Sequence, residues 1–344
     1  MDNTKENLSL RDREILNHLV LDYIQTAGPV GSRTLSEQHL KKFSPATIRA
    51  ILADLEQRGF LAQRHTSSGR IPTEKGLRFY VDTLIERRPL SDKDQEEIRG
   101  RYHLPEIQVR TLLQKTSTIL AGISRYASLV LTPQWDKNIF KHMEFLPLSQ
   151  GRLLGIFVTQ SGMVENRVIE TPDDFNFREL EKINNYCNSA FYGLTLEEAR
   201  EKTVCELAQV KTDYDQLLLK ALLLASDVLN VGQTPELLLE GEAQLLEQPE
   251  FADAEQLRRL MKTLEEKREI VRLLEHVAQS PEVQIFIGAE SETGVGQHLS
   301  LVAAPYAVRG EIVGTLGVIG PTRMDYARVI PIVDFTAQLV GSLL

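Results

Sequence analysis

Apolar residues recur at helical spacing through the first forty residues of the chain, which predicts two helices. The first is predicted to start at Ser9, because Ser9 and Asp12 have the spacing of a capping box, and to end at Gly28-Pro29. A shorter helix is predicted from Ser32 to about Leu40. A long helix followed closely by a short one is typical of a small helical module.

A third helix is predicted from Pro45 to about Arg58, with Ser44 as its N-cap. Its apolar period turns four residues toward a core, namely Ile48, Ile51, Leu52 and Leu55. The opposite side carries Ala46, Ala50, Ala53 and Gln57, flanked by Thr47 and Arg49. A merely solvated helix face normally carries Lys and Glu, whereas small side chains let a helix approach a DNA groove and place an arginine against base edges. The pattern indicates a helix-turn-helix, with a three-helix packing module that binds no ligand as the alternative.

A polar hairpin is predicted directly after the third helix. The pattern gives one strand over 60–64, a polar turn over 65–69 and a returning strand that ends at Pro72-Thr73. Donors at the tip suit phosphate oxygens, and Gly69 permits a tight turn, with a positive φ as one form of it. With the start of the second helix, the predicted DNA-binding residues are Ser32, Arg33, Ser44, Ala46, Thr47, Arg49, Ala50, Arg64, His65, Ser67, Ser68, Gly69 and Arg70.

The rest of the chain alternates between helical and strand patterns. Strands are predicted over 128–132, 141–148, 152–159, 164–169, 283–287, 299–305 and 312–319, with possible strands within 235–248. Helices are predicted over 76–90, 105–126 and 177–192, through most of 195–280, and from about 326. Strands that resume after a long helical stretch indicate an α+β chain with an inserted segment.

Charge divides the chain in the same place as the pattern. The 344 residues, of 38.9 kDa, favour two or three domains and carry a net charge of −9. Residues 31–80 hold 9 basic against 4 acidic side chains, whereas residues 91–344 hold 25 against 37. A basic N-terminal module on an acidic body favours a DNA-binding domain over indiscriminate nucleic-acid binding.

Several classes of protein are excluded or disfavoured. The polar N-terminus lacks a signal peptide and the most apolar stretch, 217–231, is interrupted by charges, so we expect a soluble cytoplasmic protein without a membrane partner. Cys187 and Cys205 cannot build a disulfide framework or a four-thiolate zinc site. No P-loop, His-Glu-x-x-His motif or nucleophile–base–acid set is present. We therefore predict no enzyme, no catalytic residues, no metal and no cofactor.

A family resemblance covers about 30–82. Its motifs are Val30-Gly31-Ser32, Ser44-Pro45-Ala46-Thr47-Ile48-Arg49, Gly59-Phe60-Leu61 and, most specifically, His65-Thr66-Ser67-Ser68-Gly69-Arg70-Ile71-Pro72-Thr73. They resemble the HrcA family of heat-inducible transcription repressors. The resemblance implies a winged helix-turn-helix, a GAF-like α/β domain and a dimerising domain inserted into the GAF-like one. It also implies a homodimer that represses chaperone operons from an inverted-repeat operator in double-stranded DNA, with activity modulated by the GroE chaperonin.

The resemblance and the pattern together suggest domain limits. We expect a winged helix over 1–90, a GAF-like domain over 91–199 and 281–344, and a mainly helical dimerising insert over 200–280. The insert contains a helix that is apolar around most of its circumference. Such a helix is buried either in a monomer core or against a second subunit. The resemblance favours the second possibility and places Leu218, Leu222 and Leu223 at the dimer interface.

Two other functions compete with the repressor. One is a winged-helix regulator whose GAF-like domain senses a metabolite. A GAF-like core filled by side chains would count against this function. The other is a protein that chiefly contacts chaperones and binds DNA only secondarily. Chaperonin binding that survives loss of residues 1–90 would favour it.

Overall fold

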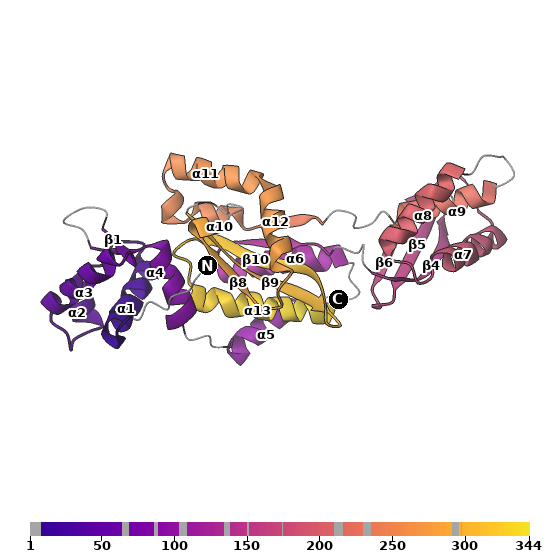
Figure 1. Ribbon diagram of the computed structural model, residues 1–344. Helices are drawn as coiled ribbons and strands as arrows, with labels where there is room; N and C mark the ends of the chain where they lie inside the picture. The colour runs from indigo at the N-terminus through magenta and orange to yellow at the C-terminus, as the bar shows by residue number, and fades with distance from the viewer. Residues whose placement is uncertain are drawn as a thin grey trace.

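The computed structural model describes residues 8–63, 69–85, 89–102, 109–133, 138–149, 151–173, 175–209, 216–229, 235–290, 296 and 298–344. Three parts follow one another in space (Figure 1). We call residues 8–85 the head and the sheet-centred part in the middle the central unit. The part that extends furthest from the head, residues 138–229, is the distal unit.

Three helices and a small hairpin form the head. The helices are α1 (Leu10–Thr26), α2 (Ser32–Gln38) and α3 (Pro45–Gln57). Strands β1 (Leu61–Ala62) and β2 (Ile71–Pro72) pair antiparallel, and α4 (Glu74–Phe79) continues into a π-helical turn, Tyr80–Leu84. The capping box of Ser9 and Asp12 is confirmed, with hydrogen bonds of 3.1 and 3.2 Å. The three predicted helices of the head are therefore confirmed.

A five-stranded antiparallel sheet forms the centre of the central unit. The strands are β3 (Ala127–Leu131), β7 (Leu237–Glu240), β8 (Gln284–Ile287), β9 (Leu299–Val308) and β10 (Glu311–Pro321). Their order is β7-β3-β10-β9-β8. Alternate residues point to opposite faces, so that Leu129 and Leu131 join one core while Val130 joins the other.

Helices cover both faces of this sheet. On the Val130 face lie α6 (Val109–Ser124) and α13 (Tyr326–Leu343), with α5 (Asp92–Gly100) beside α13. On the other face lie α10 (Glu242–Leu246), α11 (Ala254–Glu265) and α12 (Lys267–Val277), with a 3₁₀ turn at Pro249–Phe251. A second 3₁₀ turn, Gly288–Glu290, follows β8. Buried side chains thus fill the layers on both sides of the sheet.

The distal unit has its own sheet and core. Strands β4 (Phe140–Ser149), β5 (Arg152–Thr159) and β6 (Val164–Glu170) pair antiparallel in that order. Helices α7 (Phe177–Phe191) and α9 (Gln216–Leu229) pack on one face of the sheet, and α8 (Leu196–Gln209) packs against α9. The unit leaves the central sheet after β3 and returns at β7, where the Thr132 N–H donates to the carbonyl O of Glu236 at 2.9 Å.

The α+β class is confirmed, but the expected limits of the insert need correction. The range 200–280 is divided, since α8 and α9 share a core with β4–β6 while α10 to α12 pack on the central sheet. The separate unit is instead 138–229, and it contains a sheet rather than being mainly helical. Sequence pattern locates helices, but the sheet that an amphipathic helix covers depends on contacts between distant residues.

Candidate nucleic-acid interface

Helix α3 presents one exposed face on the head. Its first turn is fixed by Ser44, whose hydroxyl accepts a hydrogen bond from the Thr47 N–H at 3.1 Å. Ile48, Leu52 and Leu55 are buried and Ile51 is half-buried, so the remaining side of the helix is turned outward. The exposed predicted residues of that side are Ser44, Ala46, Thr47, Arg49 and Ala50. Because Ala46 and Ala50 carry only a methyl group, a flat surface such as a groove floor can approach the helix backbone closely there.

Arg49 is exposed and is not engaged by any acidic side chain in the part of the chain that the structure describes. The same holds for Lys41, in the turn between α2 and α3. Neighbouring cations differ, since Lys42 binds Glu14 at 2.8 Å and Arg58 lies 3.6 Å from Asp54. Arg49 on α3 and Lys41 in the preceding turn are therefore the two cations here without an acidic partner among the described residues. Lys41 was missed by the sequence prediction, although the Lys41-Lys42 pair in a helix-turn-helix turn was a visible signal.

The two predicted DNA-binding residues of helix α2, Ser32 and Arg33, differ in exposure. Ser32 is half-buried at the start of the helix, whereas Arg33 is exposed. The Arg33 Nε donates to the Glu37 carboxylate at 2.8 Å, and this hydrogen bond is the main reason that the pKa of Arg33 is raised. A phosphate group would have to replace Glu37 as the partner of Arg33.

Arg70 does not project from the hairpin as expected. Its backbone N–H and carbonyl both bond to Val30 at 2.9 Å, which brings the segment before α2 beside the hairpin. Its side chain is 16% exposed, its Nε donates to one carboxylate oxygen of Glu56 on α3 at 2.9 Å, and its Nη2 lies 2.8 Å from the same oxygen. The predicted phosphate contact is corrected, because the guanidinium already ties the hairpin to α3. The distant residue Glu56 decides this orientation, and local pattern does not reveal it.

Gly69 is required for close approach rather than for a positive φ. Its φ lies outside the left-handed region, but an added Cβ would lie 2.4 Å from the carbonyl O of Val30. The positive φ considered for this turn residue is therefore wrong. The other predicted hairpin residues, Arg64, His65, Ser67 and Ser68, lie outside the described residues.

Comparisons with known proteins agree over nearly the whole length of the chain. Residues 110–330 match the family model of the HrcA protein C-terminal domain. The chain is 42% identical over 338 residues to the heat-inducible transcription repressor HrcA of Geobacter sulfurreducens, covering 98% of each chain. It is 40% identical to the HrcA of Xylella fastidiosa strain M23, covering 98% of this chain and 96% of the relative.

The chain belongs to the HrcA family. HrcA proteins are transcription repressors of the heat response and not enzymes. A crystal structure of a hypothetical protein shares the fold, with a TM-score of 0.71, 22% identity and 98% of both chains covered. Within the described ranges, no His, Cys, Asp and Glu side chains gather in a group of three or more suited to a metal ion. The helices of the same ranges are too short or too polar to cross a membrane.

The leucines predicted at a dimer interface are only partly exposed in this chain. On α9, Leu222 is fully buried within its own subunit, Leu218 is half-buried and Leu223 is 51% exposed. The placement of Leu222 at a subunit surface is therefore corrected. An apolar helix needs burial, and here α7 and the β4–β6 sheet supply most of it.

The distal unit exposes a second apolar surface, the outer face of its sheet. Leu146, Leu154 and Val168 stand directly opposite one another on β4, β5 and β6. Leu146 is 38% exposed and Val168 is 51% exposed. Leu148 and Val164 extend the exposed apolar area along the same sheet. Glu144 and Asn166 lie on the same face between the two apolar rows. Exposed apolar residues gathered on a sheet face in this way are typical of a protein interface.

Two asparagines close the free edge of β4. The Asn188 amide accepts from the Met143 N–H at 2.8 Å and donates to the Met143 carbonyl O at 2.7 Å. The Asn184 amide accepts from the Phe145 N–H at 2.9 Å. Because the two asparagines are four residues apart on α7, they match alternate residues of the strand. Strand addition is thus blocked along this part of the β4 edge.

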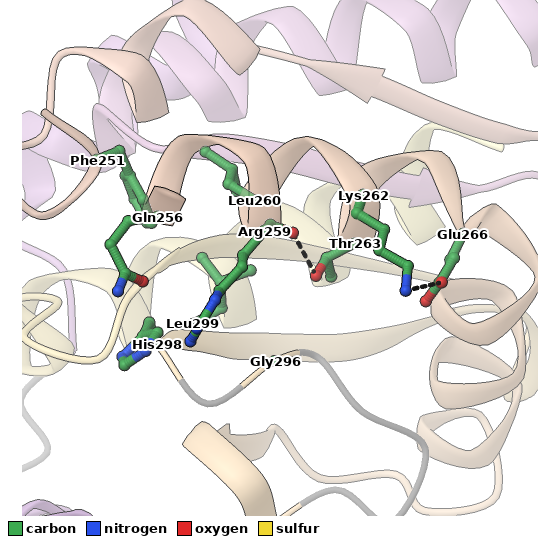
Figure 2. Close-up of a pocket in the computed structure, with 10 residues that line it drawn as sticks. All are labelled: Phe251, Gln256, Arg259, Leu260, Lys262, Thr263, Glu266, Gly296, His298 and Leu299. Atoms are coloured by element: carbon green, nitrogen blue, oxygen red, sulfur yellow. Dashed lines mark hydrogen bonds and ion pairs between the residues drawn. The ribbon is translucent and has the colours of Figure 1, made fainter. Parts of the chain in front are cut away.

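A cavity of about 300 Å³ lies between α11 and the start of β9, far from α3 (Figures 1 and 2). Phe251, Leu260 and Leu299 form its apolar part, and Figure 2 shows His298 and Arg259 at one end. Arg259 is paired with Glu255 on its own helix, and Lys262 lies 3.8 Å from Glu266. Both cations thus already have an acidic neighbour.

Proposed function

We propose that this chain is a dimeric, sequence-specific repressor of heat-shock (chaperone) operons that binds an inverted-repeat operator. The head acts as a winged helix-turn-helix, with α3 in the major groove and the hairpin as the wing. One observation carries the proposal: the exposed face of α3 presents the small side chains of Ala46 and Ala50 beside Arg49, which has no acidic partner among the described residues. A solvated helix without a ligand has no need of this composition.

The exposed residues have distinct proposed roles. Thr47 and Arg49 contact base edges, while the methyl groups of Ala46 and Ala50 pack against thymine methyls. Phosphate contacts come from Ser44, Lys41 and the start of α2, where Ser32 donates and Arg33 exchanges Glu37 for a phosphate oxygen. At the wing, Gly69 lets the hairpin pass close to the segment before α2, and the proposed phosphate donors are Arg64, His65, Ser67 and Ser68.

A DNA titration tests the repressor function. The full-length protein is added to a labelled inverted-repeat duplex from a chaperone promoter and to a scrambled duplex of equal length, over a series of salt concentrations. Operator-selective binding that weakens with salt is expected. Weak and equal binding to both duplexes, unchanged when the GroE chaperonin is added, would refute the proposal.

Two arginine variants locate the base contact. Arg49→Ala is expected to lose about 1–3 kcal/mol of operator binding and to discriminate less at one base position. Arg101→Ala is the matched control, since Arg101 pairs with Glu97 on α5, away from the head. Equal losses in the two variants would contradict the placement of α3 in the groove.

We infer that the dimer forms through the outer face of the β4–β6 sheet, which a second copy covers with the same face. A two-fold dimer supplies the two heads that an inverted repeat requires. Val168→Glu on this face is expected to give monomers in sedimentation, whereas Val204→Glu, at an exposed position of α8 in the same unit, is expected to leave the dimer intact. A dimeric Val168→Glu variant would rule this face out.

The central unit is proposed to be the GAF-like domain, and the GroE chaperonin to modulate the repressor in the cytoplasm. A five-stranded antiparallel sheet between helical layers supports the domain assignment. The chaperonin role rests on the family resemblance alone. Added chaperonin is expected to raise the fraction of protein that binds the operator, and no change in that fraction would count against the role.

Metabolite sensing is the second candidate function, and the cavity beside α11 is the observation that favours it. Against it, the layers around the central sheet are filled by side chains, and the cations of the cavity are paired within α11 and its end. The test is to measure operator affinity with and without a pool of small metabolites. A change in the affinity of the wild type that is absent in Leu260→Trp would support metabolite sensing. Leu260→Trp narrows the cavity at its apolar side.

A further inference from the structure

Arg323 joins the head to the central unit. It lies between β10 and α13, and its side chain is 10% exposed. Its Nη1 donates to the carbonyl O of Ile24 in α1 at 3.1 Å. Its Nε and Nη2 bind the Glu250 carboxylate, and Nη2 also donates to the Gln248 side chain at 3.1 Å. One guanidinium therefore connects its own loop, between β10 and α13, to Gln248 and Glu250 in the central unit and to the end of α1 in the head.

The partner in α1 explains why a cation is favourable there. Ile24 lies in the last turn of the helix, where carbonyl groups have no partner within the helix and the helix dipole is negative. The last turn of α1 contains no basic residue of its own. Arg323 supplies that charge from the central unit, so the Ile24 carbonyl has this charged partner only while the head stays docked.

Arg78 on α4 forms a second connection. Its Nε lies 3.0 and 3.2 Å from the two carboxylate oxygens of Glu290, and its Nη2 donates to the carbonyl O of Ile285 at 2.6 Å. Nearby, the Ala289 N–H donates to Glu74 at 3.3 Å. Gly288 permits this approach, because a Cβ there would lie 1.9 Å from a Glu74 oxygen.

The two arginine contacts lie away from the proposed DNA surface. Figure 1 shows α2 and α3 on the side of the head that is remote from the central sheet, while α4 faces that sheet. Arg78 and Arg323 are also engaged by carboxylates and backbone carbonyls of the central unit. Their charge is therefore used between units and not for phosphate binding.

We propose that Arg78 and Arg323 are positioning residues that fix the orientation of the head, and so determine which spacing of operator half-sites the dimer accepts. The inference rests on the proposed function, since spacing has meaning only for a dimer that reads two half-sites. The head and the central unit also share one buried apolar cluster, which includes Tyr80, Val81, Ile287 and Met324. An apolar contact leaves some freedom to slide, whereas two directional connections at separate points, the end of α1 and the side of α4, prevent rotation about either one. Two heads held at fixed orientations fit one half-site separation, whereas loosely held heads tolerate several.

The first test measures head orientation without DNA. Spin labels are attached at Gln38→Cys on α2 and Arg258→Cys on α11 in a Cys205→Ser background, diluted so that each dimer carries one labelled chain. A narrow distance distribution is expected for this protein and a broader one for Arg78→Met and Arg323→Met. Arg272→Met is the matched control, because its ion pair with Glu269 stays within α12. Unchanged distributions in both test variants would overturn the proposal.

The second test measures spacing preference on operator duplexes whose half-sites are moved apart or together by single base pairs, beside a duplex with one half-site. In the test variants, the preference for the native spacing over the altered spacings is expected to fall about tenfold, the factor that one hydrogen bond to a charged group can account for. Their affinity for the single half-site is expected to equal that of the unsubstituted protein. An unaltered preference, or a lost half-site affinity, would overturn the positioning role. If the unsubstituted protein fails to select the operator, the proposed function fails, and the distance distributions still decide whether the two arginines fix the head.

Discussion

Replacing Arg70 by alanine tests whether this arginine stabilises the head or binds DNA. In the folded head, two nitrogens of Arg70 share one oxygen of Glu56 at 2.9 and 2.8 Å. The exposed fractions of the two side chains are 16% and 32%. A fully exposed ion pair is worth about 0.2–1 kcal/mol, and a hydrogen bond to a charged group about 1.5–3 kcal/mol. This partly buried pair lies between these cases, so Arg70→Ala is expected to lower the free energy of unfolding of the head by about 1.5 kcal/mol.

Hydrogen exchange in the full chain measures this loss. The Val30 amide bonds to the Arg70 carbonyl at 2.9 Å and reports on the opening of the hairpin. Its exchange rate is expected to rise about tenfold in Arg70→Ala, the factor that corresponds to about 1.4 kcal/mol. In Glu56→Gln combined with Arg70→Ala, part of the loss is expected to return, because no unpaired carboxylate remains.

The salt dependence of operator binding gives the decisive result. An arginine that binds phosphate contributes about 0.9 to the slope of log K against log salt. We expect the slope of Arg70→Ala to equal that of the wild type. A slope flattened by about 0.9, together with unchanged hydrogen exchange, would refute the reasoning and return Arg70 to the phosphate contacts.

Three further predictions follow from local geometry. Gly69→Ala is expected to lower the stability of the head by about 1–3 kcal/mol in thermal melting, because the added Cβ would collide with a backbone carbonyl. Gly31→Ala is the control, since its Cβ would lie 3.8 Å from the nearest atom. An equal loss of stability in the two variants would contradict this reasoning. Asn188→Ala should cost about 1–3 kcal/mol and increase light scattering, since it opens the β4 edge, whereas the exposed Asn185→Ala should do neither. Burial, with repulsion from a neighbouring histidine, lowers the pKa of His18 from its ordinary value of 6.5. As the pH drops through 6.5, the unfolded chain therefore takes up this proton before the folded chain does, and the free energy of unfolding falls. A His18→Gln variant whose stability falls equally steeply over the same pH range would refute this cause.

The sequence determined the local elements of this protein and one face of its head. The period of Ile48, Leu52 and Leu55 specified both helix α3 and the side it exposes, because helical geometry relates residues three and four positions apart. Strands β4 to β6 followed similarly from alternation and from turn residues between them. Motifs of the head also sufficed to suggest the family, which the comparisons then showed.

Tertiary structure alone decided which elements share a core and which charges are free. The apolar pattern of α9 required burial, but only the folded chain shows that Leu222 is buried within its own subunit. Arg49, Arg70 and Arg323 are indistinguishable as residue types, yet one is exposed, one binds Glu56 and one bridges two units. The reason is physical: helix and strand periods act over a few residues, whereas the partner of a charge or an apolar face comes from chain segments tens or hundreds of residues away.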